Sequence, residues 1–473
     1  MTDPRAFLVG GEWRTSTDIL DIRFPYSGET IGRVCLAGTG DIEDALRCAE
    51  RGFDLTRHLP AHRRSEILSA LADLIQERAA DLIDTIMLEA GKTRALAESE
   101  VVRARETIEV SAEEARRIDG TILPLDWNAA GEGRFGCLRR FPLGPVLAVT
   151  PFNFPLNLAC HKLGPVIAAG DSVILKPASA TPISALMLGE MALDAGFPPE
   201  AISVVPCRVD LAERMVQDRR IACVSFTGSP AVGWHLREIA GRKRLGLELG
   251  GNAAVIVHED ADIPFAVARI VAGAFSNAGQ TCISVQRVYL HQPIFEEALA
   301  LLVDRVRALT VGDPREHGTD VGPMISESAA VKAFAKVQDA VAGGAKALAG
   351  GTRDGAFIAP TVLVDTIPDM EVNRTEVFAP VVTVTPYGTF DEAIALANDS
   401  EYGLQAGIFT HDARRIAQAF AELRVGGLVV NDISTFRMDH APYGGVKGSG
   451  IGREGPKYAI EEMTEERMMI FSP

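Results

Sequence analysis

Cys282 stands in a polar turn directly behind an apolar segment, where residues 273–284 read GAFSNAGQTCIS. A cysteine in such a place can be a buried apolar filler, half of a disulfide, a metal ligand or a nucleophile. The chain has seven cysteines, an odd number with no close pair, so neither a disulfide framework nor a zinc site fits. The histidines lack the H-E-x-x-H spacing of metal-dependent hydrolases. We therefore expect no metal, and Cys282 is either a buried filler or a nucleophile.

Four other polar side chains follow short apolar runs that are typical of strands. They are Asn153 in TPFNFP, Lys176 in LKPAS, Ser229 in FTGSPAVG and Glu248 in LELGG. In open α/β sheets, ligands bind at the carboxyl ends of the strands. A helix that begins just after Ser229 would offer free N–H groups to a phosphate. Taken singly, each has an ordinary alternative: a surface lysine, a glutamate facing water, or a common Gly-Ser turn.

Taken together, these motifs form an ordered set. TPFNFP, LKPASATP, FTGS, LELGGN, GQTC, EVFAPV and PYGGVKGSG occur in this order, between EAGK at 89–92 and the stretch that closes at 455. In motifs, order and spacing the chain resembles the aldehyde dehydrogenase superfamily over nearly its whole length. It is most similar to the branches that act on lactaldehyde, on glyceraldehyde 3-phosphate without phosphorylation, and on succinate semialdehyde.

The resemblance implies a role for each residue at the reacting centre. Cys282 matches the nucleophile, Asn153 matches the side chain that holds the oxyanion with the backbone N–H of Cys282, and Glu248 matches the general base. An aldehyde cannot lose hydride directly, but the alkoxide formed by thiolate addition can, and it leaves a thioester for base-activated water to cleave. Because Glu248 is present, we expect a free carboxylate as the product and not a CoA thioester.

The resemblance also implies a dinucleotide site for NAD or NADP. Lys176 matches the residue that bonds the adenosine ribose, Ser229 a contact to the pyrophosphate, and Glu376 a contact to the nicotinamide ribose. The remaining positions expected to contact the cofactor are Thr150, Pro151, Phe152, Ala178, Gly228, Val232, Leu249, Gly250 and Phe378.

The choice between the two cofactors rests on Ser179 and Arg208. Members selective for NAD often have glutamate three residues after the ribose-binding lysine, whereas this chain has the small, neutral Ser179. A 2′-phosphate is therefore tolerated there. Arg208 either pairs with that phosphate or is a solvated loop arginine. Both NAD and NADP remain open.

The substrate tunnel is expected near Arg103, His161, Ser284 and the stretch TFRMDHAPY, which contains Arg437 and His440. A polar, cationic lining favours small hydroxylated or anionic aldehydes, including sulfonated ones. Arg103 can instead pair with a helix carboxylate, and His440 can be a structural loop residue. The alternatives are an aldehyde dehydrogenase of broad specificity for neutral aldehydes, a thiol esterase that uses only Cys282, or a non-catalytic protein on the same fold.

Composition excludes several partners. Lys and Arg number 47 against 63 Asp and Glu, so the net charge of −16 disfavours nucleic acid and anionic membranes. No apolar run of 18 residues predicts a membrane span, and the N-terminal residues lack the pattern of a signal peptide. We expect a cytoplasmic enzyme.

The elements that must position these residues alternate between strand and helix. Apolar spacing predicts a helix over 65–87, capped by Ser65 and ended by Gly91, and a charged helix over about 99–118. Two series of β-rich runs follow. The first is VLAVTPF, SVILKPA, ISVVP, CVSFTGS and RLGLELGG, and the second is AAVIVHE, VQRVYLH, APVVTVTPY, AGIFT and GGLVVND. This alternation predicts two doubly wound, Rossmann-like α/β domains that meet near Gly250.

The expected division is a dinucleotide-binding domain over 1–120 and 141–250, and a catalytic domain over 251–443. Residues 121–140 read as a hairpin or an extended arm, and the C-terminal MTEERMMIFSP is also strand-like. Exposed strands of this kind tend to be paired or covered. We therefore predict an oligomerisation element from 121–140 and 444–473, in a homodimer or homotetramer.

Overall fold

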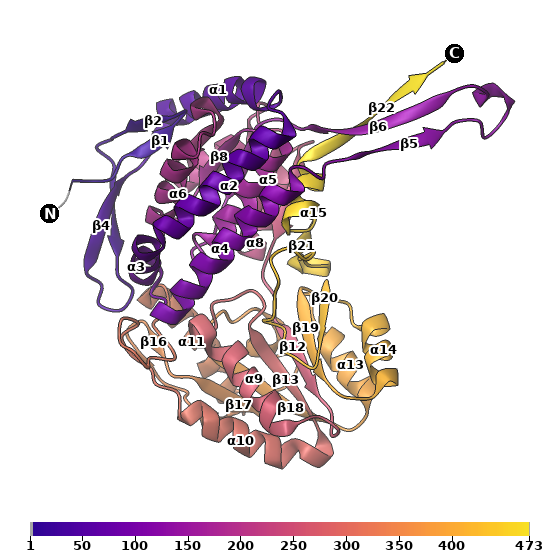
Figure 1. The fold of residues 1–473 in the computed structure, drawn as a ribbon. Helices are drawn as coiled ribbons and strands as arrows, with labels where there is room; N and C mark the ends of the chain where they lie inside the picture. Colours follow the sequence, from indigo (N-terminus) through magenta and orange to yellow (C-terminus); the bar gives the residue numbers. More distant parts are fainter. Residues whose placement is uncertain (1–2, 473) are drawn as a thin grey trace.

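The computed structural model describes residues 3–472 and consists of two α/β units and a slender β arm (Figure 1). The first unit is built on a sheet whose central strands run parallel and are almost fully buried, as expected for strands covered by helices on both faces. Its strand order is β2 (Glu12–Arg14), β1 (Phe7–Val9), β9 (Ile202–Val204), β8 (Val173–Lys176), β7 (Val146–Val149), β10 (Cys223–Thr227), β11 (Arg244–Glu248) and β21 (Gly450–Ile451).

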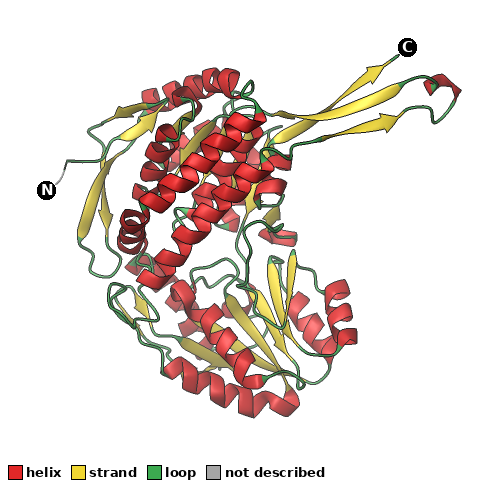
Figure 2. Ribbon diagram, viewed as in Figure 1, coloured by secondary structure: helices red, strands yellow, loops and turns green. Residues whose placement is uncertain are grey.

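Helices surround this sheet (Figure 2). They are α1 (Thr39–Thr56), α2 (Ala61–Glu77), α3 (Ala79–Ala90), α4 (Arg94–Glu114), α5 (Asn157–Ala169), α6 (Ile183–Asp194), α7 (Val209–Gln217), α8 (Pro230–Ile239) and α15 (Pro456–Glu462). A hairpin of β3 (Ile19–Arg23) and β4 (Thr30–Cys35) lies along one side.

The second unit repeats this plan. Its strand order is β14 (Lys346–Ala349), β17 (Thr361–Val364), β18 (Val381–Tyr387), β13 (Val285–His291), β12 (Ala253–Val257), β19 (Gln405–Phe409) and β20 (Gly427–Val430). Its helices are α9 (Ile263–Phe275), α10 (Phe295–Arg307), α11 (Glu327–Ala342), α12 (Glu371–Arg374), α13 (Phe390–Asn398) and α14 (Ala413–Glu422), with a small hairpin of β15 (Arg353–Asp354) and β16 (Phe357–Ile358).

Every strand of the two predicted series is present, which confirms the doubly wound α/β class. The predicted division near Gly250 falls between β11 and β12, which belong to different sheets. No helix among the residues that the structure describes is long and apolar enough to cross a membrane.

The predicted helix over 65–87 is wrong in its boundaries. It is two helices, α2 and α3, separated at Arg78 (φ −98°, ψ 16°), whose guanidinium bonds Glu190 of α6 at 2.6 Å. Ser65 caps nothing, because α2 begins four residues earlier after the extended Pro60, and Ser65 is buried inside the helix. Gly91 does end α3 in the left-handed conformation, with φ 68°. The second helix, α4, also begins earlier than predicted, at Arg94.

The projecting arm consists of β5 (Gly120–Pro124), β6 (Phe135–Pro142) and β22 (Thr464–Phe471), in the order β22-β6-β5 (Figure 1). Both predicted arm segments are therefore strands. The boundary at 444 is wrong, because β21 pairs with β11 in the first sheet and α15 packs against α5. Gly450 has φ 143°, which only glycine adopts readily, and this conformation lets the chain approach β11.

A buried ion pair holds the turn that follows β7. The side chains of Lys92 and Glu100 are fully buried, and Lys92 Nζ lies 2.5 Å from Glu100 Oε2. The other oxygen, Oε1, accepts the backbone N–H groups of Leu156 and Asn157 at 3.0 and 3.1 Å. Lys92 Nζ also lies 3.5 Å from the centre of the Phe154 ring. The pair therefore fixes the segment that carries Asn153 into α5.

Replacing Glu100 by alanine should destabilise the chain strongly, because it leaves the buried ammonium of Lys92 unpaired and two N–H groups unsatisfied. Breaking a buried pair costs about 3–5 kcal/mol, so the urea midpoint should fall clearly. Glu98→Ala, at an exposed position of the same helix, is the matched control and should leave the midpoint unchanged. Equal urea midpoints for Glu100→Ala and Glu98→Ala would contradict a stabilising role for the buried Lys92–Glu100 pair.

Candidate active site

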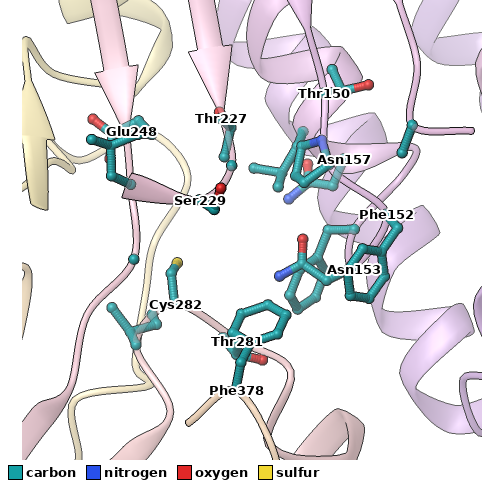
Figure 3. Close-up of a pocket in the computed structure, with 18 of the residues that line it drawn as sticks. Thr150, Phe152, Asn153, Asn157, Thr227, Ser229, Glu248, Thr281, Cys282 and Phe378 are labelled. Carbon is teal, nitrogen blue, oxygen red and sulfur yellow. The ribbon is translucent and has the colours of Figure 1, made fainter. Parts of the chain in front are cut away.

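One cavity of about 810 Å³ is lined by residues of both α/β units. The ends of β7, β8, β10 and β11 reach it from the first unit, and the segments around Cys282 and Glu376 reach it from the second. Figure 3 shows Cys282 and Asn153 facing the cavity from opposite sides, with Glu248 at the end of a strand beyond them. Residues far apart in the sequence thus meet in one space.

A strained turn presents Cys282. The short 3₁₀ turn Ser276–Gly279 precedes it, and Asn277 and Ala278 both have φ 52°. A Cβ on Gly279 would lie 2.0 Å from the carbonyl oxygen of Ala379, so only glycine fits there. Positive φ at ordinary residues costs free energy and persists only where the surrounding structure enforces it. The turn therefore places the thiol at the cavity wall.

The thiol of Cys282 has one polar partner in the cavity. Its Sγ lies 2.9 Å from the hydroxyl oxygen of Tyr443. Burial raises the pKa of Cys282, and the hydrogen bond with Tyr443 lowers it; burial has the larger effect, and the pKa is about 12. A hydroxyl that donates to sulfur favours the thiolate, so Tyr443 offsets part of the effect of burial.

Asn153 carries an amide that is only partly used. Its Nδ2 donates to the backbone oxygen of Gln280 at 2.9 Å, and an amide nitrogen has a second N–H. Its Oδ1 is buried and has no hydrogen-bond partner among residues 3–472. The side chain is 5% exposed and held close to the Cys282 turn. It therefore has a donor to spare beside the nucleophile.

Glu248 and Glu454 are buried carboxylates whose pKa values are shifted in opposite directions. Burial, reinforced by the charge of Glu454, raises the pKa of Glu248 well above its usual range, and its Oε2 has no partner within the described chain. Burial alone would also raise the pKa of Glu454, but Lys162 and Arg437 outweigh it and hold that pKa at about 2. Two carboxylates with separated pKa values are a pattern typical of acid–base sites.

The arginines predicted for the substrate tunnel reach the cavity but are paired. Arg103 donates from Nε and Nη2 to Asp439, both at 2.8 Å. Arg437 donates to Glu454 at 3.1 Å and lies 3.3 Å from Asp439, with its guanidinium stacked 3.8 Å over the ring of Tyr443. The alternative in which Arg103 pairs with a carboxylate is the one observed, although the partner comes from a loop and not from a helix.

Three other predicted substrate residues do not line the cavity. His161 is buried behind the wall, where its Nε2 lies 2.9 Å from Asp439. Ser284 turns away and donates to the carbonyl oxygens of Gly273 and Ala274 in α9. His440 is exposed in its loop. Sequence proximity to the tunnel motifs did not specify the direction of these side chains.

The predicted cofactor residues lie around the cavity, with one exception. Those that line it are Thr150, Pro151, Phe152, Lys176, Ala178, Ser179, Gly228, Ser229, Val232, Leu249, Gly250, Glu376 and Phe378. Arg208 does not, because its guanidinium makes a two-bond pair with Asp18 at 3.0 Å on the exposed surface. In this structure it is therefore an exposed loop arginine paired with Asp18.

The cofactor end of the cavity has the features of an anion and ribose site. Ser229 precedes α8 without using its side chain as a cap, so the first N–H groups of the helix remain for a phosphate. Burial lowers the pKa of Lys176 at the end of β8. Glu376 accepts the N–H of Gly251 at 3.1 Å, and burial raises its pKa to about 7. A Cβ on Gly250 would lie 2.3 Å from Glu376 Oε2, so a side chain there would displace the Glu376 carboxylate.

Sequence reasoning missed several lining residues, among them Tyr443, Glu454 and Arg269. Tyr443 lies in the quoted motif PYGGVKGSG, and Glu454 lies in the stretch after it that closes at 455, but neither had an assigned role. Arg269 stands one helical turn before Gly273 on α9, and both line the cavity. That i, i+4 spacing was the available signal. Arg269 is paired with Asp432 at 2.6 and 3.1 Å.

The comparisons with known proteins agree with this geometry. Residues 13–469 match the model of the aldehyde dehydrogenase family. The 3-sulfolactaldehyde dehydrogenase of Priestia aryabhattai is 43% identical over 465 residues, which cover 98% of this chain and 97% of that protein.

Two solved structures are similar throughout. Aldehyde dehydrogenase 21 of Physcomitrella patens, in complex with the reaction product succinate, has a TM-score of 0.97 and 39% identity, with 99% of each chain covered. The glyceraldehyde-3-phosphate dehydrogenase GapN of Methanocaldococcus jannaschii, complexed with NADP, has a TM-score of 0.93 and 35% identity, covering 97% of this chain and 100% of the other. The chain therefore belongs to the aldehyde dehydrogenase family and is an NAD(P)-dependent enzyme.

Proposed function

We propose that this cavity oxidises a small polar or anionic aldehyde to its carboxylic acid, with NAD or NADP as the hydride acceptor. One observation carries the proposal. Cys282, Asn153 and Glu248 line a cavity that continues to Lys176, Ser229 and the other residues expected to hold a dinucleotide. A thiol, an oxyanion donor, a base and a dinucleotide site are the parts that this oxidation needs.

In the first half-reaction, the Cys282 thiol releases its proton to solvent, and the thiolate Sγ adds to the carbonyl carbon. The spare N–H of Asn153 and the backbone N–H of Cys282 hold the oxygen that becomes an alkoxide. Losing one such donor typically costs about 3 kcal/mol of transition-state stabilisation. The bound nicotinamide supplies the acceptor for hydride from the tetrahedral carbon. What remains on Cys282 is a thioester.

In the second half-reaction, Glu248 takes a proton from water, and the water oxygen attacks the thioester carbon. The carbon–sulfur bond breaks and the carboxylic acid leaves. The proton held by Glu248 passes to the departing sulfur, which restores the thiol of Cys282 and the carboxylate of Glu248. Only the ionised carboxylate accepts a proton, and the pKa of Glu248 is raised by burial and by Glu454. The rate of this half-reaction therefore rises with pH as Glu248 ionises.

The substrate class is supported by the relatives and by two arginines. The similar proteins are named for 3-sulfolactaldehyde and glyceraldehyde 3-phosphate, or hold succinate, and each of these molecules carries an anionic group. Arg103 and Arg269 line the cavity and each spends Nε and Nη2 on one aspartate. Each then has Nη1 left to donate, and charge-assisted bonds to an anion contribute about 1.5–3 kcal/mol.

A panel of short aldehydes tests this function. With either cofactor, kcat/KM for succinate semialdehyde, 3-sulfolactaldehyde and glyceraldehyde 3-phosphate should exceed that for butanal. Arg103→Gln and Arg269→Gln should each lower it about tenfold or more for the anionic aldehydes and little for butanal, since one charge-assisted bond is lost. Arg105→Gln, on the same helix as Arg103 but paired with Glu109 at the surface, is the control. A preference for butanal would contradict the proposed substrate class.

Glu248→Gln should separate the two half-reactions. An amide cannot take a proton from water, so a burst of about one reduced cofactor per chain should precede turnover at least ~100-fold slower than in the parent. The rise of the parent turnover rate with pH should also disappear. Cys282→Ala should show neither burst nor turnover. A folded Glu248→Gln enzyme without a burst would mean that Glu248 acts before thioester formation.

Ser179 is proposed to face the adenosine ribose and to admit a 2′-phosphate. It is exposed and lines the cavity three residues after Lys176, and GapN, which is similar, holds NADP. Ser179→Glu should lower kcat/KM with NADP at least about tenfold through like-charge repulsion, and leave NAD nearly unaffected. Ser179→Gln is the control, because glutamine is as large as glutamate but neutral, so it shows the effect of side-chain size without the charge. Equal losses with both cofactors would place Ser179 away from the ribose.

The arm is proposed to join subunits in a homodimer or homotetramer. Large apolar side chains stand exposed on it, including Ile122, which is 72% exposed, and Phe135, Met469 and Phe471. The rings of Phe135 and Phe471 stack at 4.7 Å across β6 and β22 without being covered. An exposed apolar surface on a small sheet whose outer strands, β5 and β22, are unpaired on one side is typical of an interface.

A further inference from the structure

The neighbouring strands β12, β13 and β18 of the second sheet have their carboxyl ends side by side. Three polar side chains with aromatic rings meet at these strand ends. His258 directly follows β12, while His291 and Tyr387 close β13 and β18 and are paired in register. The imidazoles of His258 and His291 stack with their centres 4.2 Å apart. None of the three lines the catalytic cavity. Carboxyl ends of parallel strands are where ligands bind in this class of fold.

The hydrogen bonds of Tyr387 and His258 fix which nitrogen of His258 carries the proton. The Tyr387 hydroxyl donates to the carbonyl oxygen of Val257 at 3.3 Å, so it must accept from His258 Nδ1, which lies 2.8 Å away. His258 Nε2 then has a lone pair and no proton. That nitrogen is buried and has no hydrogen-bond partner in the described part of the chain, and His258 is 3% exposed.

The same reasoning applies to His291. Its Nε2 lies 3.3 Å from the carbonyl oxygen of Gly388, which can only accept, so Nε2 carries the proton. In the neutral imidazole, His291 Nδ1 is then a second lone-pair nitrogen, also buried and without a hydrogen bond in residues 3–472. It faces Glu259 Oε2 at 3.6 Å, which is also an acceptor. Two acceptors that face each other need a cation between them.

We propose that His258 Nε2, His291 Nδ1 and the carboxylate of Glu259 bind a divalent late first-row transition-metal ion, Zn²⁺ foremost. One donor atom from each of the three residues lies within 4.8 Å of the other two. Two imidazoles and one carboxylate are a set that zinc takes readily. Tyr387 and the carbonyl oxygen of Gly388 hold the opposite ring nitrogens, which is the second layer that histidine ligands normally have.

The site is open on one side, because the side chain of Glu259 is 50% exposed. An ion can therefore enter from solvent and keep water as a further ligand. It would tie the ends of β12 and β13 together, on the edge opposite to the catalytic thiol. Cys282 lies three residues before the start of β13 and His291 ends it, and the seven-residue strand itself spans roughly 20 Å. The site is independent of the proposed oxidation.

The test uses the full chain with the catalytic thiol removed, because thiolates also bind zinc. Chelator-treated Cys282→Ala protein is titrated with Zn²⁺ by calorimetry, and bound metal is counted by mass spectrometry after dialysis. We expect one ion per chain. Co²⁺ in its place should show ligand-field bands without the thiolate charge-transfer band that a cysteine site would give.

Variants then locate the ion. Glu259→Gln and His291→Ala, both in the Cys282→Ala background, should weaken Zn²⁺ binding at least tenfold, and Tyr387→Phe should weaken it by loosening His258. His235→Ala removes another histidine–carboxylate pair, His235 with Glu213 at 3.2 Å, and should change nothing. No bound Zn²⁺ in the Cys282→Ala protein, or equal affinity in Glu259→Gln and the control, would overturn the site and leave a shared proton as the bridging cation.

Discussion

Two buried carboxylates, Asp439 and Glu454, tie the C-terminal segment to the first α/β unit beneath the active site. Charges removed from water need partners of opposite sign, and removing one partner from such a cluster is costly. The cationic partners come from separate elements: Arg103 from α4, Lys162 from α5 and Arg437 from the loop itself. His161 of α5 adds a hydrogen-bonding contact to Asp439. The same loop carries Tyr443, whose hydroxyl oxygen lies 2.9 Å from Cys282 Sγ, so the pairing also positions a contact of the nucleophile.

The pairing also sets the acid–base character of the site. Lys162 and Arg437 keep Glu454 ionised, and the negative charge of Glu454 in turn raises the pKa of Glu248. The stacked guanidinium of Arg437 orients the Tyr443 ring, whose hydroxyl contacts Cys282. A change in the loop would therefore reach both the nucleophile and the base, although neither Glu454 nor Arg437 needs to touch the reacting carbon.

The fold and the reacting residues could be predicted because both leave local signals. Buried parallel strands are continuous apolar runs, and residues such as Lys176 and Glu248 stand at their carboxyl ends. What could not be predicted was the direction of side chains on loops. Ser284 is two residues from Cys282 yet bonds carbonyl groups of α9, because a 3₁₀ turn with positive φ reorients the chain. The predicted start of α2 at Ser65 was wrong because the helix begins directly after the extended Pro60.

The aspartates paired with the arginines of the cavity wall explain how this wall can select anionic aldehydes without holding the product too tightly. A bare arginine in a buried cavity would hold any anion, including the carboxylate product, and would slow its release. Arg103 and Arg269 are each paired with an aspartate and offer only the donors that the aspartate leaves. The net attraction for an anion is then weaker than that of a bare arginine, while the remaining N–H groups still donate charge-assisted hydrogen bonds. An aldehyde whose anionic end reaches those donors while its carbon meets Cys282 gains both contacts, and a neutral aldehyde gains one.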